Sequence, residues 1–312
     1  MAKHHGAAIW FVLVAGGACG KASMPMDALH PGHGGTGGSG ASAGGASGGG
    51  AGGTATAQGC PDFLGQTLKT FSVDIAVDGA RPRPGTVRMA VPAYFNASDS
   101  QWQRLIAGAP TVGMIVFNPD SGPGTAADPA YAKVIAQAQA AGITMLGYVA
   151  TSYGARPEAE VIADINHYYD FYGLSGIYFA EGPMENDCMP MEAMYHRFSD
   201  AVKARDTQAY QAVGTRFCPT YITFFDMMVQ FARNWSEYQT DYTPPSWMPA
   251  NSSARFCHFV NSVPASDASA ALSRTIANGA GWVFVTDHSD PNAWGALPTY
   301  FDEELDTLRG VQ

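Results

Sequence analysis

The sequence predicts a (β/α)8 barrel that follows a signal segment and a Gly/Ser-rich linker. Eight short apolar runs alternate with helical stretches over about 250 residues, which is the order of elements in a parallel barrel. The part from Cys60 to Gln312 is 253 residues long and contains no second Gly/Ser linker, which favours one large domain. Residues 34–53, in contrast, hold 12 of the 36 glycines and have no apolar surface to bury.

Each predicted strand is a short run rich in β-branched and aromatic residues. Such runs are typical of strands that are buried on both faces of a parallel sheet. In chain order they span Val87–Tyr94, Val112–Phe117, Ile143–Val149, Gly176–Phe179, Tyr210–Gly214, Phe225–Phe231, Phe256–Val260 and Trp282–Thr286.

Helices are predicted between these strands, over Ala130–Ala141, Glu158–Tyr172, Met189–Arg205, Ala268–Asn278 and Phe301–Leu308. Asp128-Pro129 supplies a cap and a first-turn proline to the first of them, and Gly142 and Gly279 fit left-handed caps. The fifth to seventh units are less regular, since Pro219–Phe224 is short and residues 234–254 resemble a loop. A doubly wound open sheet therefore stays as an alternative fold.

The N-terminus has the features of an export signal. Lys3 precedes the apolar run Ala7–Ala15, which is too short for a bilayer span of about 20 residues but suits a signal peptide. Small residues then lead to Cys19, as in a bacterial lipobox, although Gly16 stands where Leu is usual. We expect a signal peptide over residues 1–19, a linker over 20–59 and the barrel domain over 60–312. Lipid anchoring at Cys19 and plain secretion both remain open, and the anchor is the only membrane contact that we expect.

Composition excludes several classes of partner. Lys and Arg number 17 against 27 Asp and Glu, a net charge of −10, whereas a phosphate backbone requires a basic face. No cysteine pair has zinc-finger spacing, and the four histidines of the domain are scattered. We therefore expect no nucleic acid, no metal and no other cofactor.

Polar and aromatic side chains follow the predicted strands. Loops after the C-terminal ends of the strands form the active sites of (β/α)8 barrels. We therefore expect a site built from Tyr94, Asn96, Asn118, Thr151, Tyr153, Glu181, Thr215, Asn261, Asp287 and His288. Aromatic faces stack on sugar rings, and amides and carboxylates pair with hydroxyls, so this set indicates a polysaccharide or another glycan as the partner.

Three stretches of the domain match a known family pattern. They are Asn118-Pro119-Asp120-Ser121-Gly122-Pro123-Gly124, then Gly147-Tyr148-Val149-Ala150-Thr151-Ser152-Tyr153-Gly154-Ala155-Arg156, and Asp164-Ile165 with Tyr168-Tyr169 leading into Gly176-Ile177-Tyr178-Phe179. Through these stretches the chain from Val91 to about Thr299 resembles spherulation-specific family 4. The resemblance implies a (β/α)8 fold and kinship to endo-acting glycoside hydrolases that cut N-acetylgalactosamine-containing polysaccharide.

The chain departs from this family where the resemblance places the catalytic acids. The family strand usually ends Phe-Asp-Glu, but here it reads Phe179-Ala180-Glu181. A later family stretch, Asp-x-x-Val-x-Phe-Glu, corresponds to Asp226 through Phe231 followed by Ala232. Most glycosidases need two carboxyl groups, and a methyl group replaces neither. The resemblance thus leaves Glu181 as the remaining candidate acid.

Three hypotheses follow. The barrel is catalytically silent and still binds polysaccharide; or Glu181 works with a new partner among Glu185, Asp187 and Asp287; or the domain is a passive surface module. Glu181 also has a structural alternative, in which it pairs with Arg156 or caps backbone amides. His288 beside Asp287 completes the candidate set.

The four cysteines after Cys19 allow three pairings. Cys188 and Cys218 follow neighbouring strands, so we favour a bond between them at the rim of the site. Cys60 then pairs with Cys257, or both are free. Trp235, Trp247 and Trp294 fall in late loops, as sugar platforms or as packing residues.

Overall fold

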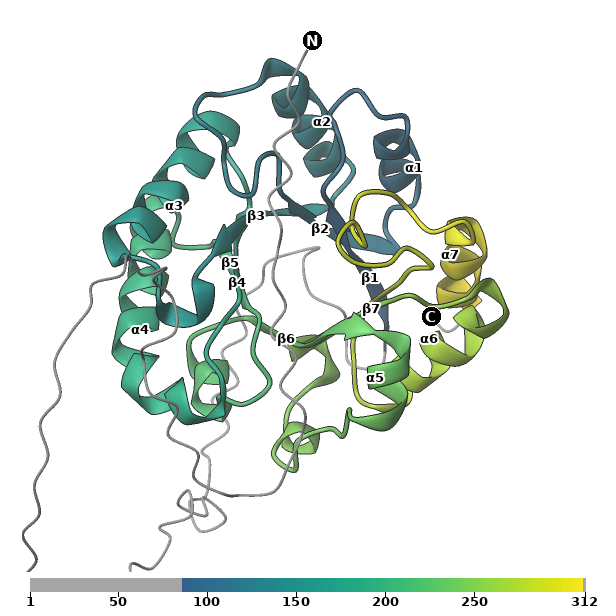
Figure 1. The fold of residues 1–312 in the computed structure, drawn as a ribbon. Coiled ribbons are helices and arrows are strands. Elements are labelled where there is room, and N and C mark those ends of the chain that lie inside the picture. The colour runs from purple at the N-terminus through teal and green to yellow at the C-terminus, as the bar shows by residue number, and fades with distance from the viewer. Residues whose placement is uncertain (1–85, 311–312) are drawn as a thin grey trace, which may run out of the picture. The chain divides into compact units, whose positions relative to one another are not determined.

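A computed structural model describes residues 86–310, which form a closed barrel of eight parallel strands. The strands follow one another around the barrel in chain order, and the last pairs with the first through Arg88 and Trp282. Helices surround the strands (Figure 1). The barrel prediction is confirmed, and the closing pair excludes an open sheet.

The strands lie where the apolar runs predicted them. Their bounds are β1 Arg88–Ala93, β2 Val112–Phe117, β3 Thr144–Ala150, β4 Gly176–Ala180, β5 Tyr210–Val213, β6 Met227–Asn234, β7 Phe256–Asn261 and β8 Trp282–Val285. Most of their residues are buried, because one face of each strand fills the barrel and the other packs under the outer layer.

Seven α-helices form the outer layer of the described region. They are α1 Gln101–Ala107, α2 Pro129–Ala140, α3 Glu158–Tyr172, α4 Cys188–Arg205, α5 Trp235–Thr240, α6 Ala268–Ala277 and α7 Phe301–Gly310. Asp128 caps α2 by accepting a hydrogen bond from the Ala130 amide at 2.7 Å. Gly142 and Gly279 both have positive φ, as their predicted caps require. Among residues 86–310, no helix is both long enough and apolar enough to cross a bilayer.

Two of these helices were not predicted. α1 has seven residues and no side-chain cap, so its periodicity is too short to recognise. α5 begins inside the stretch that was expected to be a loop. Asn234 accepts a hydrogen bond from the Glu237 amide and donates one to the Glu237 carboxylate, a capping pair visible in the sequence as Asn-x-x-Glu.

The connection between β5 and β6 has no α-helix. It contains only the 3-10 helix Pro219–Thr223, and the connection from β6 to β7 continues beyond α5 as a long irregular segment. The outer layer is therefore thinnest beside β5 and β6, on the flank between α4 and α5.

α7 brings a buried carboxyl group, that of Glu304, against the last strand. Its Oε1 accepts a hydrogen bond from the Val285 amide at 3.0 Å, while Oε2 is buried with no partner. Burial raises the pKa of Glu304 from 4.5 to about 8, because the charged form is poorly solvated there. Glu304 is therefore protonated in the folded barrel at neutral pH.

This carboxyl group predicts a pH-dependent stability. Between pH 4.5 and 8 the folded state holds a proton that the unfolded state releases, so the free energy of unfolding falls as pH rises through that window. We expect Glu304→Gln to match the parent protein at pH 5 and to be more stable by roughly 3–5 kcal/mol at pH 9. Urea unfolding at both pH values measures this, with exposed Glu303→Gln as the matched control. An equal pH dependence in Glu304→Gln and its parent would contradict the assignment.

Candidate functional site

Backbone strain gathers at the mouth of the barrel, where the strands end. All five non-glycine residues with positive φ in the described region lie in loops that follow strands: Ser121, Ser152, Tyr153, Glu181 and Ser262. Each such conformation costs on the order of 1–3 kcal/mol, and such residues cluster at functional sites. The mouth is therefore the first candidate site, and its side chains decide what it can do.

Ala180 points into the barrel. The outward neighbour on β4 is Phe179, whose ring stacks at 5.7 Å on Phe198 of α4. Tyr178 points inward, with its ring 6.2 Å from that of Tyr148. Because side chains alternate along a strand, Ala180 shares the inward face with Tyr178.

Ala232 also points inward, near the end of β6. Phe231 faces outward, with its ring 4.7 Å from that of Tyr238 in α5. Ala232 is in register with Phe259 of β7, whose ring packs at 5.9 Å against Trp294 over the mouth. Partners in parallel register lie on the same face of the sheet, so both alanine methyl groups face the interior side of the mouth.

Glu181 lies at the rim, directly after β4, with φ at 54°. Its carboxylate accepts a hydrogen bond from the Ser152 amide at 3.2 Å, and its backbone oxygen accepts one from the Tyr153 amide at 2.7 Å. Arg156 pairs instead with Asp164 at 2.7 Å. Of the two structural alternatives for Glu181, the structure shows the contact to a backbone amide.

Thr151 ties the ends of β3 and β4 together. Its hydroxyl lies 2.9 Å from the oxygen of Ala180, 2.7 Å from that of Glu181 and 2.6 Å from the Tyr195 hydroxyl. The Thr151 amide donates to the same Ala180 oxygen at 3.1 Å. This buried cluster fixes the backbone on which Glu181 and Tyr153 are presented.

Tyrosine rings line the barrel beneath the rim. The rings of Tyr94 and Tyr148 are 5.5 Å apart, and Tyr178 follows Tyr148. Burial raises the pKa of all three phenols, and the charge of Glu181 raises them further. They remain neutral hydroxyl groups at physiological pH. Tyr153 differs, because its side chain stands at the rim with 48% of the residue exposed.

Other predicted site residues build the loops. Asn118 accepts a hydrogen bond from the Gly122 amide at 2.8 Å, which closes its own loop. Asp287 accepts two from Thr299, at 3.2 Å from the amide and 2.6 Å from the hydroxyl. His288 is 3.0 Å from the Leu297 oxygen. These polar groups are engaged within the protein.

Three further residues of the predicted set also hold loops. Thr215 donates to the Pro183 oxygen at 2.8 Å, and Asn261 donates to Asp290 at 3.3 Å. The backbone oxygen of Asn96 accepts the Trp102 indole N–H at 3.1 Å, while its side chain is exposed.

Cys188 and Cys218 form a disulfide bond, as predicted from their positions. Cys188 begins α4, just after the 3-10 helix Glu185–Asp187, and Cys218 follows β5. Cys257 is buried and free, and Cys60 lies outside the described residues. The bond holds the segment of Glu185 beside the loop that follows β5.

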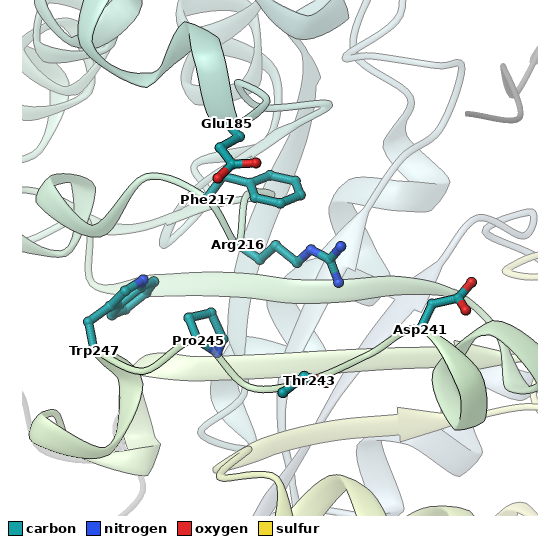
Figure 2. Close-up of a pocket in the computed structure, with 7 residues that line it drawn as sticks. All are labelled: Glu185, Arg216, Phe217, Asp241, Thr243, Pro245 and Trp247. Atoms are coloured by element: carbon teal, nitrogen blue, oxygen red, sulfur yellow. The ribbon is translucent and has the colours of Figure 1, made fainter. Parts of the chain in front are cut away.

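Beside this disulfide is a pocket of about 340 Å³ on the thin flank of the barrel. Glu185, Arg216, Phe217, Asp241, Thr243, Pro245 and Trp247 line it, and Figure 2 shows the Arg216 guanidinium between the other side chains. Glu185 thus belongs to this flank rather than to the set at the mouth. Asp187, two residues later, lies at the start of α4 and is only partly exposed. Arg216 and Phe217 were not among the site residues predicted from the sequence.

The three late tryptophans have different roles. Trp235 is a packing residue, since it is buried at the start of α5 and donates to Asp267 at 3.1 Å. Trp294 packs on Phe259 and on Phe284 and so covers part of the mouth. Trp247 is half-buried and lines the flank pocket. Within residues 86–310, no group of three His, Cys, Asp or Glu side chains is arranged to hold a metal ion.

The chain is similar in sequence to a known protein family and in fold to solved structures. The profile of spherulation-specific family 4 matches residues 88–308. Spherulin-4 of Physarum polycephalum is 38% identical over 99 residues, a match that spans 30% of this chain and 30% of spherulin-4.

Two solved structures are similar to the barrel. The crystal structure of Aspergillus clavatus Sph3 in complex with GalNAc has a TM-score of 0.62 at 23% identity and covers 72% of this chain and 98% of Sph3. The glycoside hydrolase domain of PgaB (BpsB) from Bordetella bronchiseptica has a TM-score of 0.50 at 9% identity, covering 72% of this chain and 98% of its own. At these identities the matches show a shared barrel fold.

The disulfide predicts a measurable share of the stability. It closes a segment with a sequence separation of 30, for which chain entropy gives roughly 3–4 kcal/mol. We expect the double variant Cys188→Ser/Cys218→Ser to lose about that much free energy of unfolding in a denaturant titration. The parent protein under reducing conditions is the control and should lose the same amount. A loss below about 1 kcal/mol in both would show that the bond adds little to the fold.

Proposed function

Because the chain belongs to spherulation-specific family 4, we propose that its barrel binds an amino-sugar polysaccharide at the mouth without cleaving it by the paired-acid route of glycosidases. The observation that carries this proposal is the inward orientation of Ala180 and Ala232. By the resemblance, these are the two positions at which the family pattern has carboxylic acids. This chain has a methyl group at each of them.

Hydrolysis of a glycosidic bond needs a proton donor and a second carboxylate that attacks or activates water. General acid catalysis alone contributes about 10²–10⁴-fold to the rate. The methyl groups of Ala180 and Ala232 supply neither function, and they make the two positions uncharged. A glycan at this mouth is therefore held and not cut by that chemistry.

Several rim groups suit a sugar. Tyr153 offers an exposed aromatic face, and Glu181 places a carboxylate that can accept hydrogen bonds from hydroxyl or amino groups. Neutral phenols such as Tyr148 can donate hydrogen bonds from below. The complex of Sph3 with GalNAc supports an amino sugar as the ligand class.

The alternative with a displaced catalytic pair is less well supported by the contacts. Asp287 is held by Thr299, and Glu185 lines the flank pocket. Glu181 contacts the Ser152 amide at the rim. Within residues 86–310, Asp187 is the one proposed partner whose side chain has no hydrogen bond and does not line the flank pocket. The displaced pair thus keeps a single candidate partner, and the binding function is the better supported one.

Export completes the proposal. A disulfide bond is typical of proteins that fold in an oxidising compartment, and Cys188–Cys218 is such a bond. Together with the signal segment predicted over residues 1–19, which lies outside the described residues, it supports a position at the cell envelope or outside the cell. Anchoring through a lipid on Cys19 would place the binding barrel at the end of the Gly-rich linker.

The first test is binding without turnover. In gels that contain galactosamine-bearing polysaccharide, we expect retarded migration of the protein and no new reducing ends after long incubation. Tyr153→Ala should weaken retention about tenfold because it removes the stacking face, while Tyr153→Phe should retain most of it. His167→Ala, which removes an exposed ring from α3, is the control. Release of reducing ends that Glu181→Gln abolishes would contradict the proposal.

The second test restores the missing acids. Because both alanines face the mouth, Ala180→Asp combined with Ala232→Glu should create measurable release of reducing ends from the same polysaccharide. Each single variant should release fewer reducing ends than the double variant, since it restores only one of the two positions beside Glu181. Thermal unfolding shows whether the double variant is folded. A folded and polymer-binding double variant with no activity would contradict the assignment of these two positions.

A further inference from the structure

The flank pocket contains a guanidinium group, that of Arg216, which is in no close ion pair within residues 86–310. Arg216 is half-buried and forms no hydrogen bond or ion pair with any residue of the described region. Its one recorded contact is with the ring of Phe217, 4.7 Å from the guanidinium carbon. Burial and the nearby charge of Arg233 lower the pKa of Arg216. A guanidinium that forms no hydrogen bond within the described region has its five N–H donors available to a ligand.

The other walls of the pocket complement these donors. Glu185 and Asp241 place carboxylates around the guanidinium, close enough to act on it electrostatically, but neither forms an ion pair with it (Figure 2). Trp247 and Pro245 provide apolar faces, and Thr243 adds a hydroxyl. Donors and acceptors around an apolar face are what a ring with several hydroxyl groups requires.

The fold explains why the pocket is there. The β5–β6 connection lacks an α-helix, so the place of an outer helix is taken by the irregular segment that follows α5. The disulfide bond fixes one wall, because Cys188 and Cys218 lie close in sequence to Glu185 and Arg216. At about 340 Å³ the pocket has the size of a small-ligand site.

We propose that this pocket is a second carbohydrate site, which takes one uncharged sugar ring of the same polysaccharide, with Arg216 donating to its hydroxyls and Trp247 stacking on its face. This inference rests on the proposed function and extends it beyond the mouth. The two carboxylates around the guanidinium repel an anionic ligand, and the guanidinium itself repels a cationic ligand. The hydroxyl groups of an uncharged ring can accept hydrogen bonds from Arg216 and, at the same time, donate hydrogen bonds to Glu185 or Asp241.

Arg233 lies near the end of β6, at the mouth end of that strand. Its charge acts both on Arg216 in the pocket and on Tyr153 at the rim. Arg233 is held by Glu237 at 2.9 Å. A polymer that occupies the mouth can therefore continue over this rim to the flank, and two linked contacts strengthen binding more than either alone.

The test measures dissociation constants by affinity electrophoresis in galactosamine-bearing polysaccharide. Arg216→Met keeps the apolar stem and removes the donors, and we expect binding to weaken about tenfold. Arg216→Lys should give an intermediate loss. Arg309→Met, which removes an exposed cation from α7, should bind like the parent. Since Arg216 has no hydrogen-bond or ion-pair partner within residues 86–310, Arg216→Met should unfold at the parent temperature or above it, which separates lost binding from lost folding.

The outcomes distinguish the two sites. Normal binding by Arg216→Met together with weak binding by Tyr153→Ala would overturn the pocket and leave the mouth proposal standing. The reverse result would overturn the mouth proposal and leave the pocket. Tighter binding of an anionic polysaccharide, such as a uronic-acid polymer, by the parent but not by Arg216→Met would show an anionic ligand and overturn the uncharged ring. If the parent protein is not retained at all, both proposals fail.

Discussion

The alternation of side chains along two strands determines what the mouth of this barrel can do. Phe179 and Phe231 are held outward by aromatic contacts with α4 and α5. A shift of register by one residue would turn these two rings into the barrel and turn the inward-facing side chains of the same strands toward the helices. The contacts of the rings with the helices therefore fix which side chains face the interior. Ala180 and Ala232 face the mouth for this reason, so the side chains at these two positions affect the chemistry of the mouth and not the packing of the outer layer.

Much of the family pattern in this chain serves to build the rim. A side chain at Gly147 would collide with the ring of Tyr168, so the glycine allows α3 to pack closely on β3. Thr151 joins β3 to β4, and Arg156 holds the following turn through Asp164 and the Ala150 oxygen. Such residues are needed by a barrel that binds as much as by one that cleaves. The presence of this pattern alone therefore does not distinguish a barrel that binds from one that cleaves.

The strands could be predicted closely because each is a compact apolar run, buried on both faces. The short helices α1 and α5 could not, since seven and six residues give too little periodicity. At the site, the sequence showed which residues follow the strands. It did not show which of their polar side chains would form hydrogen bonds within the loops themselves. Asn118 and Asp287 bind backbone amides, an engagement that depends on loop conformation. The flank pocket was missed because its walls come from three separate connections and share no motif.

A crystal structure of the barrel grown with an N-acetylgalactosamine oligosaccharide would show whether the mouth binds the sugar without cutting it. We expect an intact oligosaccharide across the mouth, against Tyr153 and Glu181, with the methyl groups of Ala180 and Ala232 facing it. A cleaved or covalently attached sugar, or a mouth from which these two methyl groups point away, would contradict it.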